Sequence, residues 1–581
     1  MKILLLITSF NGLSQRAWVE LDKRNHQVKV HITSTPEKMI DAVNEYQPDL
    51  IIAPYLKLAI PEIIWKNHTC LIAHPGIVGD RGSNSLDWAI LNNEKEWGIT
   101  ILQAVEKMDA GPVWASECFP MRNVSKSFLY RHEVTQAALK GLLKAVHLFE
   151  EKNSVSKTND CIEKKGKWNR STNQEDFKFV WSDDTVSIIK KINAADSFPG
   201  AVSSILDEEY FCFGVREEEK LKGTPGQILA KRNNAICIST KDAALWIQCL
   251  RKKNNADSIK IPATIALDDK VNQISASALN VFEDDLSIKT FREIWYEEHN
   301  HVGYLHFDFY NGAMSTDQCE RLKGAFIEAK QRKTKVIVLM GGEDIWSNGI
   351  HLNIIEASPN PAQTSWENIN AIDDLIKEII CTDTHYIISA LQGNAGAGGV
   401  ALAIATDKVI ATKGIVLNPH TRNMGLFGSE YWTYLLPKRI GTERATLFTE
   451  QCLPWGIDIA LEVKLIDDCF EETGIAFRGK VKRTAEEVAG LSYFQQLIKA
   501  KNFKRNRDES YKPLQKYREE ELEKMYKNFF EDDCGYDWKR HCFVHKKDPG
   551  SEKNSITDKD FFSERRKIWR RRKDEKMFYE V

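Results

Sequence analysis

The chain has 581 residues, enough for about three or four domains of roughly 100 to 200 residues each. Its 80 basic and 82 acidic residues nearly cancel, and no domain-sized region is strongly basic, which argues against a nucleic-acid or membrane partner. Twelve cysteines without a CxxC pair favour a reducing compartment over disulfides or zinc, and no run of about 18 apolar residues could span a membrane, so we expect a cytoplasmic protein with no metal site.

The first 110 residues alternate short apolar runs with amphipathic stretches. The runs cover residues 2–9, 26–32, 49–56 and 69–75. Strands separated by helical patterns predict βαβ units and a parallel, Rossmann-like sheet. In such a sheet the loops after the strands bind ligands, and the first of these loops contains Phe10 and Asn11. Residues 150–168 are polar and charged, which is typical of a linker.

The next hundred residues have a different pattern. A helix is expected over 183–194, a turn at 197–201, and short strands over 209–215, 226–232, 235–241 and 244–250, which together favour a small β-barrel or sandwich. A polar join at 270–298 leads to a second α/β region, with strands over 302–309, 335–342 and 384–393 and a helix over 317–331. We therefore expect a multidomain α/β chain with domains at 1–160, 161–269, 270–500 and 501–581.

The last 80 residues have a helical, highly charged pattern with aromatic residues throughout. Two stretches mix basic and aromatic residues, Tyr536–His541 and Arg565–Lys573. Such a mixture is compatible with nucleic acid or with the phosphates of a nucleotide ligand. Nearby acidic residues favour the simpler interpretation that these stretches are solvated helix faces.

Three short motifs in the first domain form one pattern: Ile72-Ala73-His74-Pro75, Arg81-Gly82 and Asp109-Ala110-Gly111. The pattern resembles the folate-dependent formyltransferase family. Formyl transfer passes through a tetrahedral oxyanion that needs a donor, and the attacking group must lose a proton. By that resemblance His74 is suited to donate to the oxyanion, and Asp109 to orient and charge it or to relay the proton through water. The resemblance also implies a folate pocket lined by Phe10, Asn11, Ile72, Arg81, Gly82 and Gly111.

One position departs from that family. Its motif has an Asn, a second oxyanion donor, where this chain has Ile72. The loss of one such donor typically costs about a hundredfold or more in rate. Either another group supplies the donor, or the acceptor is a good nucleophile such as a thiolate.

Two glycine-bearing loops mark the second α/β region, SNGIHL at 347–352 and QGNAGAGG at 392–399. Together they resemble the crotonase (enoyl-CoA hydratase/isomerase) superfamily, in which two backbone N–H groups hold a thioester oxygen. The matching donors are Ile350 and Gly398, and the resemblance implies that Gly349 and Gly399 line the coenzyme A site. Backbone donors at a helix start suit this role because they are rigid and the helix adds partial positive charge.

The carboxylates of a hydratase are absent. Ala401 and His420 stand at the positions of its two glutamates, so addition of water to an enoyl-CoA is not expected. Another acid or base must serve. Glu430 in GLFGSEYW is the first candidate and His420 the second, although a glutamate in a first helical turn is also simply favourable for the helix.

A formyltransferase-like half followed by a crotonase-like half resembles the hydrogenase maturation factor family HypX/HoxX over nearly the whole chain. That resemblance implies formyl transfer from 10-formyltetrahydrofolate to coenzyme A and then decarbonylation of formyl-CoA, with carbon monoxide becoming an iron ligand of [NiFe] hydrogenase. Two alternatives stay open: a folate-dependent transferase or deformylase with a CoA-sensing domain, and a non-catalytic scaffold for hydrogenase maturation proteins. Residues 188–201 resemble the carboxy-terminal domain of methionyl-tRNA formyltransferase, but nearby acidic residues argue against tRNA.

Overall fold

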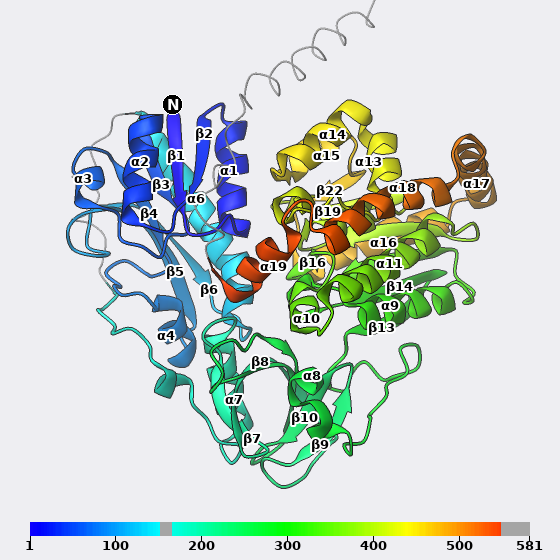
Figure 1. Cartoon of the computed structure of the whole chain (residues 1–581), viewed down its shortest axis with the longest axis horizontal. Coiled ribbons are helices and arrows are strands. Elements are labelled where there is room, and N and C mark those ends of the chain that lie inside the picture. Colours follow the sequence, from blue (N-terminus) through cyan, green and yellow to red (C-terminus); the bar gives the residue numbers. More distant parts are fainter. Residues whose placement is uncertain (152–164, 548–581) are drawn as a thin grey trace, which may run out of the picture. The chain divides into compact units, whose positions relative to one another are not determined.

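The computed structural model describes residues 1–151 and 165–547, which fall into two compact units (Figure 1). Met1–Arg122 and Tyr130–Ser171 belong to the first unit, and Asn123–Leu129 and Thr172–Pro549 to the second. Within the described ranges, no helix combines the length and the hydrophobicity needed to cross a bilayer. The second stretch of basic and aromatic residues, Arg565–Lys573, lies outside the described part of the chain.

The first unit is built on a six-stranded sheet with the order β2-β1-β3-β4-β5-β6. Its strands are β1 (Lys2–Ile7), β2 (Gln27–Ile32), β3 (Leu50–Ala53), β4 (Cys70–His74), β5 (Glu96–Gln103) and β6 (Val113–Pro120). The first four are parallel, as the βαβ pattern predicts, but β5 and β6 are antiparallel. The four strands that the sequence predicts are therefore parallel, whereas β5, which the sequence did not predict, turns back beside β4 instead of crossing over.

Helices cover both faces of this sheet. They are α1 (Gly12–Lys23), α2 (Pro36–Tyr46), α3 (Glu62–Trp65), α4 (Ser85–Leu91) and α6 (Thr135–Glu150), with the π-helical turn η1 (Tyr130–Val134) before α6. Asn11 caps α1, and its side chain accepts a hydrogen bond from the amide of Ser14 at 3.0 Å. Because parallel strands end at one edge, the Asn11 loop and His74 lie on the same edge of the sheet.

The second unit begins with a mainly antiparallel β region. Its elements are α5 (Lys126–Leu129), η4 (Gln174–Phe177), α7 (Thr185–Ala195), β7 (Ala201–Ile205), β8 (Glu208–Glu218), β9 (Ile228–Arg232), β10 (Ala235–Ser239), β11 (Ala244–Lys252), β12 (Ile261–Pro262), α8 (Ala263–Leu267) and η5 (Asp268–Val271). The order is β7-β8-β11-β10-β9, with β12 on β11. The sequence predicts four of these strands and α7. It missed β7, where a tight turn at Leu206 and Asp207, both at positive φ, joins two strands.

The rest of the second unit holds two further sheets. The larger runs β13-β14-β15-β17-β19-β22 and the smaller β16-β18-β20-β21. The strands are β13 (Ile294–His299), β14 (Val302–Phe307), β15 (Val336–Gly341), β16 (Ile345–Ser347), β17 (Tyr386–Leu391), β18 (Asn394–Gly396), β19 (Lys408–Thr412), β20 (Val416–Asn418), β21 (Trp455–Gly456) and β22 (Asp468–Phe470). Strands β16 and β18 pair in parallel, which sets the loops after them side by side.

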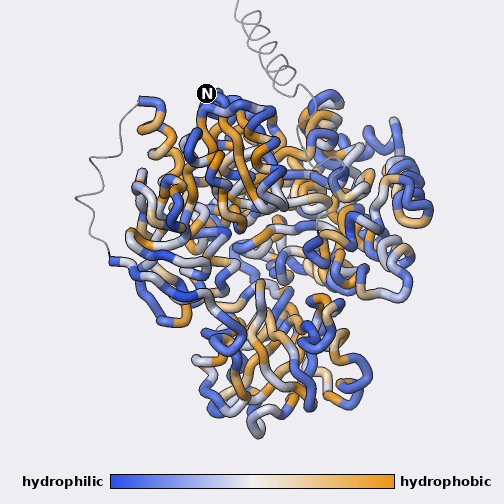
Figure 2. The backbone as a smooth tube through the Cα atoms, turned by 60° about the vertical axis from the view of Figure 1, so that its left-hand side comes forward, coloured by the Kyte–Doolittle hydropathy of each residue, from blue (hydrophilic) through white to orange (hydrophobic). Residues whose placement is uncertain are grey.

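Helices pack around these sheets (Figure 1). They are η6 (Tyr310–Gly312), α9 (Thr316–Ala329), α10 (Leu352–Ala357), α11 (Pro361–Ile380), α12 (Gly398–Ile404), η7 (Thr421–Met424), α13 (Trp432–Ile440), α14 (Thr442–Gln451), α15 (Ile457–Glu462), α16 (Gly474–Ala489), α17 (Phe494–Tyr511), α18 (Leu514–Tyr526), η8 (Lys527–Glu531) and α19 (Tyr536–His545). Hydrophobic residues concentrate in the interior of each unit (Figure 2), where strands β14 and β15 are buried along their whole length and β1 is buried from Ile3 to Ile7.

The charged tail is not only a solvated surface. On α19, Tyr536 and Arg540 are buried, and the hydroxyl of Tyr536 lies 3.0 Å from that of Ser365. Trp538 is exposed, as expected for a solvated face. The interpretation of Tyr536–His541 as a solvated face was therefore wrong for one side of α19, because helical periodicity turns those residues onto α10 and α11.

Candidate functional sites

His74 stands at the end of β4 between two carboxylates. Its Nε2 lies 3.0 Å from Oδ2 of Asp80, and its Nδ1 lies 3.5 Å from Oδ1 of Asp109. The amide of Gly82 donates to Oδ2 of Asp109 at 3.3 Å, which ties the Arg-Gly motif to the Asp-x-Gly motif. The three sequence motifs therefore meet around one buried imidazole.

The sequence analysis missed Asp80, which is fully enclosed beside His74. The hydroxyl of Ser85 donates to Oδ2 of Asp80 and lies 3.3 Å from Nε2 of His74, while Nδ2 of Asn169 donates to Oδ1 at 3.1 Å. A buried carboxylate with this many donors is held in one orientation. Asp80 thus holds Nε2 of His74, the ring nitrogen that does not face Asp109.

Asn169 comes directly after the predicted linker, which ends at residue 168. The amide of Gly166 donates to the carbonyl of Val78, that of Arg81 to the carbonyl of Lys167, and that of Asn169 to the carbonyl of Arg81. Residues 165–169 therefore pack on the loop after His74, and the linker interpretation was wrong for residues 165–168. Gly82 has φ 121°, and a Cβ on it would collide with the carbonyl oxygen of Asn169, so this approach requires glycine.

The other expected pocket residues occupy different settings. Phe10 and Asn11 form the turn before α1, and the carbonyl of Phe10 accepts from the side chain of Gln15 at 2.9 Å. Ile72 lies within β4 and packs against the apolar cluster around Ile51 and Met39. Gly111 lies against the carbonyl of Gln103, where a Cβ would collide. A close backbone contact therefore explains why residue 111 is a glycine. The guanidinium of Arg81 has no side-chain partner among the described residues.

The two glycine loops of the second unit lie in contact. A Cβ built on Gly349 would lie 3.2 Å from the amide nitrogen of Gly398, the first residue of α12. Among the described residues, neither the Ile350 nor the Gly398 amide has a hydrogen-bond acceptor. Gly399 instead packs against the carbonyl of Ser347, which leaves it no room for a side chain. Two unpaired N–H donors on neighbouring loops are what an oxyanion site requires.

Glu430 lies directly beside Gly398, one of these two donors. A Cβ on Gly398 would collide with Oε1 of Glu430, and Oε2 accepts from the amide of Ser429 at 2.9 Å. Glu430 and Tyr431 both have positive φ, 64° and 58°, an uncommon conformation for residues with side chains. Strained backbone of this kind persists only where the surroundings hold it in place.

Two buried carboxylates supply that support. Asp373 on α11 accepts from the Ser429 hydroxyl at 2.8 Å and from the Glu430 amide at 2.8 Å. Glu521 on α18 accepts from the amides of Tyr431 and Thr433, each at 2.9 Å. The charged carboxy-terminal helices therefore help to build this site, a role for which the charge pattern gives no signal.

Burial raises the pKa values of three carboxyl groups that lie close together, and the charge of Asp373 raises those of the other two further. Burial, followed by the charge of Asp373, raises the pKa of Glu430 to about 8. Burial likewise raises the pKa of Asp373 to about 7 and that of Glu521 to about 8, and in Glu521 the charge of Asp373 adds to this. A carboxyl group with a pKa near neutrality can both accept and return a proton.

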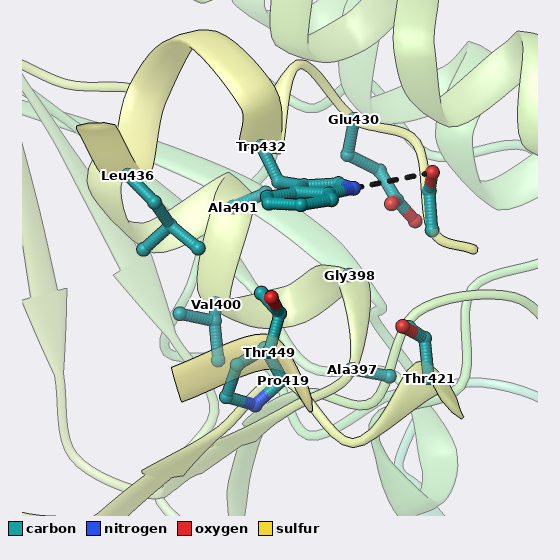
Figure 3. Close-up of a pocket in the computed structure, with 11 residues that line it drawn as sticks. Ala397, Gly398, Val400, Ala401, Pro419, Thr421, Glu430, Trp432, Leu436 and Thr449 are labelled. Atoms are coloured by element: carbon teal, nitrogen blue, oxygen red, sulfur yellow. Dashed lines mark hydrogen bonds between the residues drawn. The ribbon is translucent and has the colours of Figure 1, made fainter. Parts of the chain in front are cut away.

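A small cavity opens beside Gly398 and Glu430 (Figure 3). Its walls come from the start of α12, the loop after β20, α13 and α14, and are lined by Ala397, Gly398, Val400, Ala401, Pro419, Thr421, Gly428, Glu430, Trp432, Leu436 and Thr449. The indole N–H of Trp432 donates to the carbonyl of Gly428 at 3.3 Å, which fixes the ring as one wall. The cavity is small and partly open.

The second acid–base candidate is placed differently. His420 does not line the cavity, although its neighbours Pro419 and Thr421 do. Its Nδ1 lies 2.7 Å from the carbonyl oxygen of Asn418, and burial lowers its pKa. Of the two candidates, the geometry therefore favours Glu430 as the group that meets a ligand held at Gly398.

Three family models match successive parts of the chain. They are Formyl transferase over residues 13–146, Formyl transferase, C-terminal domain over 172–260, and Enoyl-CoA hydratase/isomerase over 298–553. The Hydrogenase maturation factor HoxX of Bradyrhizobium diazoefficiens is 42% identical over 94% of this chain and 95% of its own length. This chain belongs to the HypX/HoxX family of hydrogenase maturation factors.

Solved structures agree with that family. Crystal structures of HypX from Aquifex aeolicus, one of them in complex with tetrahydrofolic acid, superpose with a TM-score of 0.90 at 44% identity. They cover 94% of this chain and 96% of their own. The family and the multidomain α/β fold expected from the sequence, a formyltransferase-like half followed by a crotonase-like half, are thereby confirmed. A methionyl-tRNA formyltransferase from Legionella pneumophila is 22% identical over only 39% of the chain.

Proposed function

We propose that this HypX/HoxX-family chain transfers the formyl group of 10-formyltetrahydrofolate to coenzyme A and then splits the resulting formyl-CoA into carbon monoxide and coenzyme A. The observation that carries the proposal is Glu430, a buried carboxyl group that lies beside Gly398 and lines a small cavity there. The match to HoxX over 94% of the chain supports a role in supplying carbon monoxide to [NiFe] hydrogenase, with hydrogenase maturation proteins as partners.

In the first site His74 would act on the formyl group. A coenzyme A thiolate attacks the formyl carbon, the bond from that carbon to the folate nitrogen breaks, and the nitrogen takes up a proton. Because Asp80 holds Nε2 of His74 at 3.0 Å, Nδ1, whose contact with Asp109 is longer at 3.5 Å, is the ring nitrogen that would donate to the oxygen that becomes negative. We propose Phe10, Asn11, Ile72, Arg81, Gly82 and Gly111 as the lining of the folate pocket, with the unpartnered Arg81 guanidinium suited to an anionic part of the ligand.

In the second site the amides of Ile350 and Gly398 would hold the formyl oxygen, with Gly349 and Gly399 shaping the loops that present them. Ionised Glu430 takes the proton from the formyl carbon, the carbon–sulfur bond breaks, carbon monoxide leaves, and the thiolate recovers the proton from Glu430. A pKa of about 8 suits both halves of this exchange. The Ala401 wall, where hydratases carry a glutamate, leaves no carboxylate there to activate water.

The test uses purified protein, 10-formyltetrahydrofolate and coenzyme A under anaerobic conditions, with a haem protein that reports carbon monoxide. For Glu430→Gln we expect unchanged folate consumption, accumulation of formyl-CoA, and carbon monoxide formation lowered by about 10²- to 10⁴-fold. Glu443→Gln, on the exposed start of α14, is the matched control and should retain full activity.

Other outcomes identify the alternatives. Folate consumption without any formyl-CoA or carbon monoxide would mean a deformylase whose crotonase-like part only senses a ligand. Absence of turnover in the wild-type chain would favour a scaffold for hydrogenase maturation proteins. His420→Ala serves as a further comparison, because a loss as large as that of Glu430→Gln would reassign the proton transfer.

A further inference from the structure

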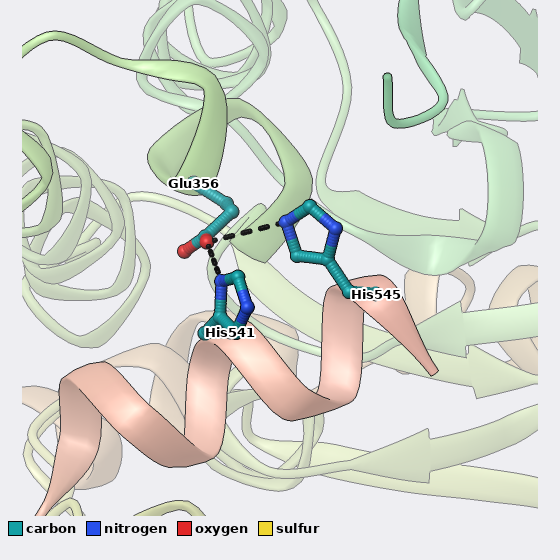
Figure 4. Close-up of side chains that lie close together, drawn as sticks. All are labelled: Glu356, His541 and His545. Carbon is teal, nitrogen blue, oxygen red and sulfur yellow. Dashed lines mark hydrogen bonds and ion pairs between the residues drawn. The ribbon is translucent and has the colours of Figure 1, made fainter. Parts of the chain in front are cut away.

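A cluster of possible metal ligands lies between α10 and α19, apart from the cavity beside Glu430. His541 and His545 are one helical turn apart on α19, and Glu356 faces them from α10 (Figure 4). One ligand atom from each residue lies within 4.8 Å of the others. Two imidazole nitrogens and a carboxylate oxygen therefore converge on a single point.

The distances show how this convergence is made. Nδ1 of His541 lies 2.8 Å and Nε2 of His545 lies 3.5 Å from the same oxygen, Oε1 of Glu356. The two imidazole rings lie with centroids 4.2 Å apart. The i, i+4 spacing places both histidines on one face of the helix, which is the arrangement used by helical zinc ligands.

The carboxylate is already oriented for this role. Arg540 is buried, and its Nε donates to Oε2 of Glu356 at 2.7 Å, which leaves Oε1 directed toward the histidines. A ligand carboxylate held by a second hydrogen bond is typical of protein metal sites. The three side chains are partly exposed, with 12% to 32% of their surface accessible, so an ion can enter from solvent.

We propose that Glu356, His541 and His545 bind one Zn²⁺ ion through two imidazole nitrogens and one carboxylate oxygen, with a fourth position open to water. Borderline nitrogen donors with a carboxylate favour zinc over calcium or magnesium, which prefer oxygen alone. This site is additional to the proposed chemistry and does not depend on it.

The ion would join two parts of the second unit. Helix α10 begins two residues after Ile350, and His351 is its N-cap, with Nδ1 accepting from the amide of Ile354 at 3.2 Å. Helix α19 is the last described helix of the chain. A zinc ion would therefore fasten α19 to the helix that follows the Ile350 loop and limit the movement of that loop.

One neighbour opposes binding. Nζ of Lys547 lies 3.0 Å from Nε2 of His541. Coordination through Nδ1 requires that Nε2 carry the proton, so the two groups would then both be donors, and Lys547 would have to turn away. Lys547 is exposed and free to do so. Lys547→Ala should accordingly bind zinc more tightly than the wild-type chain.

The test is calorimetric titration of ZnCl₂ into the full chain, purified without a polyhistidine tag and stripped with a chelator. We expect one saturable site per chain and a higher thermal midpoint with zinc. His541→Gln and His545→Gln should each weaken binding by at least about tenfold. The control is His299→Gln, because His299 also bonds a glutamate, Glu486, at 2.7 Å but belongs to no cluster of three possible ligands among the described residues.

Cysteines must be separated from this site, since the described residues include 11 free thiols. Co²⁺ in place of zinc should give the absorption of nitrogen and oxygen ligation without a thiolate charge-transfer band. The proposal would be overturned by the absence of saturable zinc binding, by a thiolate band, or by equal affinity in His545→Gln and His299→Gln. Equal thermal midpoints of all variants in chelator would establish that the histidine changes leave the fold intact.

Discussion

In the proposed mechanism, the formyltransferase-like site and the crotonase-like site both stabilise a carbonyl oxygen that gains negative charge, but with different groups. In the first, the proposed donor is a side chain, His74, which lies between Asp80 and Asp109, with Ser85 and Asn169 bonded to Asp80. In the second, the proposed donors are two backbone amides, and a buried carboxyl group, Glu430, would accept and return the proton. A side-chain donor is lost by one substitution, whereas a backbone donor is lost only when the loop is displaced.

The largest effect should come from the side-chain site. His74→Ala should lower folate-dependent formyl transfer by about 10²- to 10⁴-fold, because it removes the imidazole that is the proposed hydrogen-bond donor to the oxyanion. Decarbonylation of supplied formyl-CoA should not change. The absorbance of tetrahydrofolate measures the first rate and a haem protein the second. His147→Ala, exposed on α6, is the control, and equal losses in both variants would refute the assignment.

The backbone site should respond to a single methyl group. Gly398→Ala would place Cβ against Oε1 of Glu430, so the loop or the carboxyl must move. Carbon monoxide formation should fall by about 10²- to 10³-fold, the usual cost of one oxyanion donor, while folate consumption persists. Gly324 lies in the middle of α9, where an added Cβ would meet no neighbouring atom within 4 Å. Gly324→Ala should therefore keep full activity and gain about 0.5–1 kcal/mol of stability. Similar activity in the two variants would contradict the placement of Gly398.

The carboxyl cluster predicts a pH dependence for the second site alone. Carbon monoxide formation should rise with pH up to about 8, as Glu430 ionises. The negative charge of Asp373 contributes to that raised pKa, so Asp373→Asn should move the midpoint of the pH–rate profile to lower pH. Asp317→Asn, half exposed at the start of α9, is the control. An unmoved midpoint in Asp373→Asn would show that another group sets the profile.

The smallest effect concerns stability. Folded Glu430 keeps a proton until about pH 8, whereas the unfolded chain releases it above about pH 4.5. The folded state therefore binds more protons between these values, and its free energy of unfolding should decrease as pH rises from about 4.5 to 8. Urea unfolding of Glu430→Gln should show a shallower decrease than the wild-type chain. Parallel pH profiles would mean that Glu430 is ionised in the folded state at neutral pH.

Short-range patterns explain what could be predicted from the sequence. His74, Arg81-Gly82 and Asp109 belong to motifs close in the chain, and the two glycine loops each follow an apolar strand. The backbone conformations that need glycine, and the alternation of strands and helices, can be predicted from the order of residues along the chain. The family, the order of its two halves and most strands followed from these patterns.

Long-range packing explains the rest. Asn169 meets Asp80 from 89 residues away, Asp373 meets the Glu430 amide across 57 residues, and Glu521 meets Tyr431 across 90. The helical sequence pattern does not distinguish an acidic residue that faces water from one that accepts a hydrogen bond from a buried amide.

The sequence by itself determined the family, the order of its two halves and the motifs on which the two proposed chemistries rest, because those motifs are set by local chain geometry. Only the tertiary structure decided which carboxylates hold His74 and Glu430 in place, and that Glu356 would meet His541 and His545. The physical reason is that burial and desolvation, which give a carboxyl group its orientation and its shifted pKa, are properties of the packed surroundings and not of the residue.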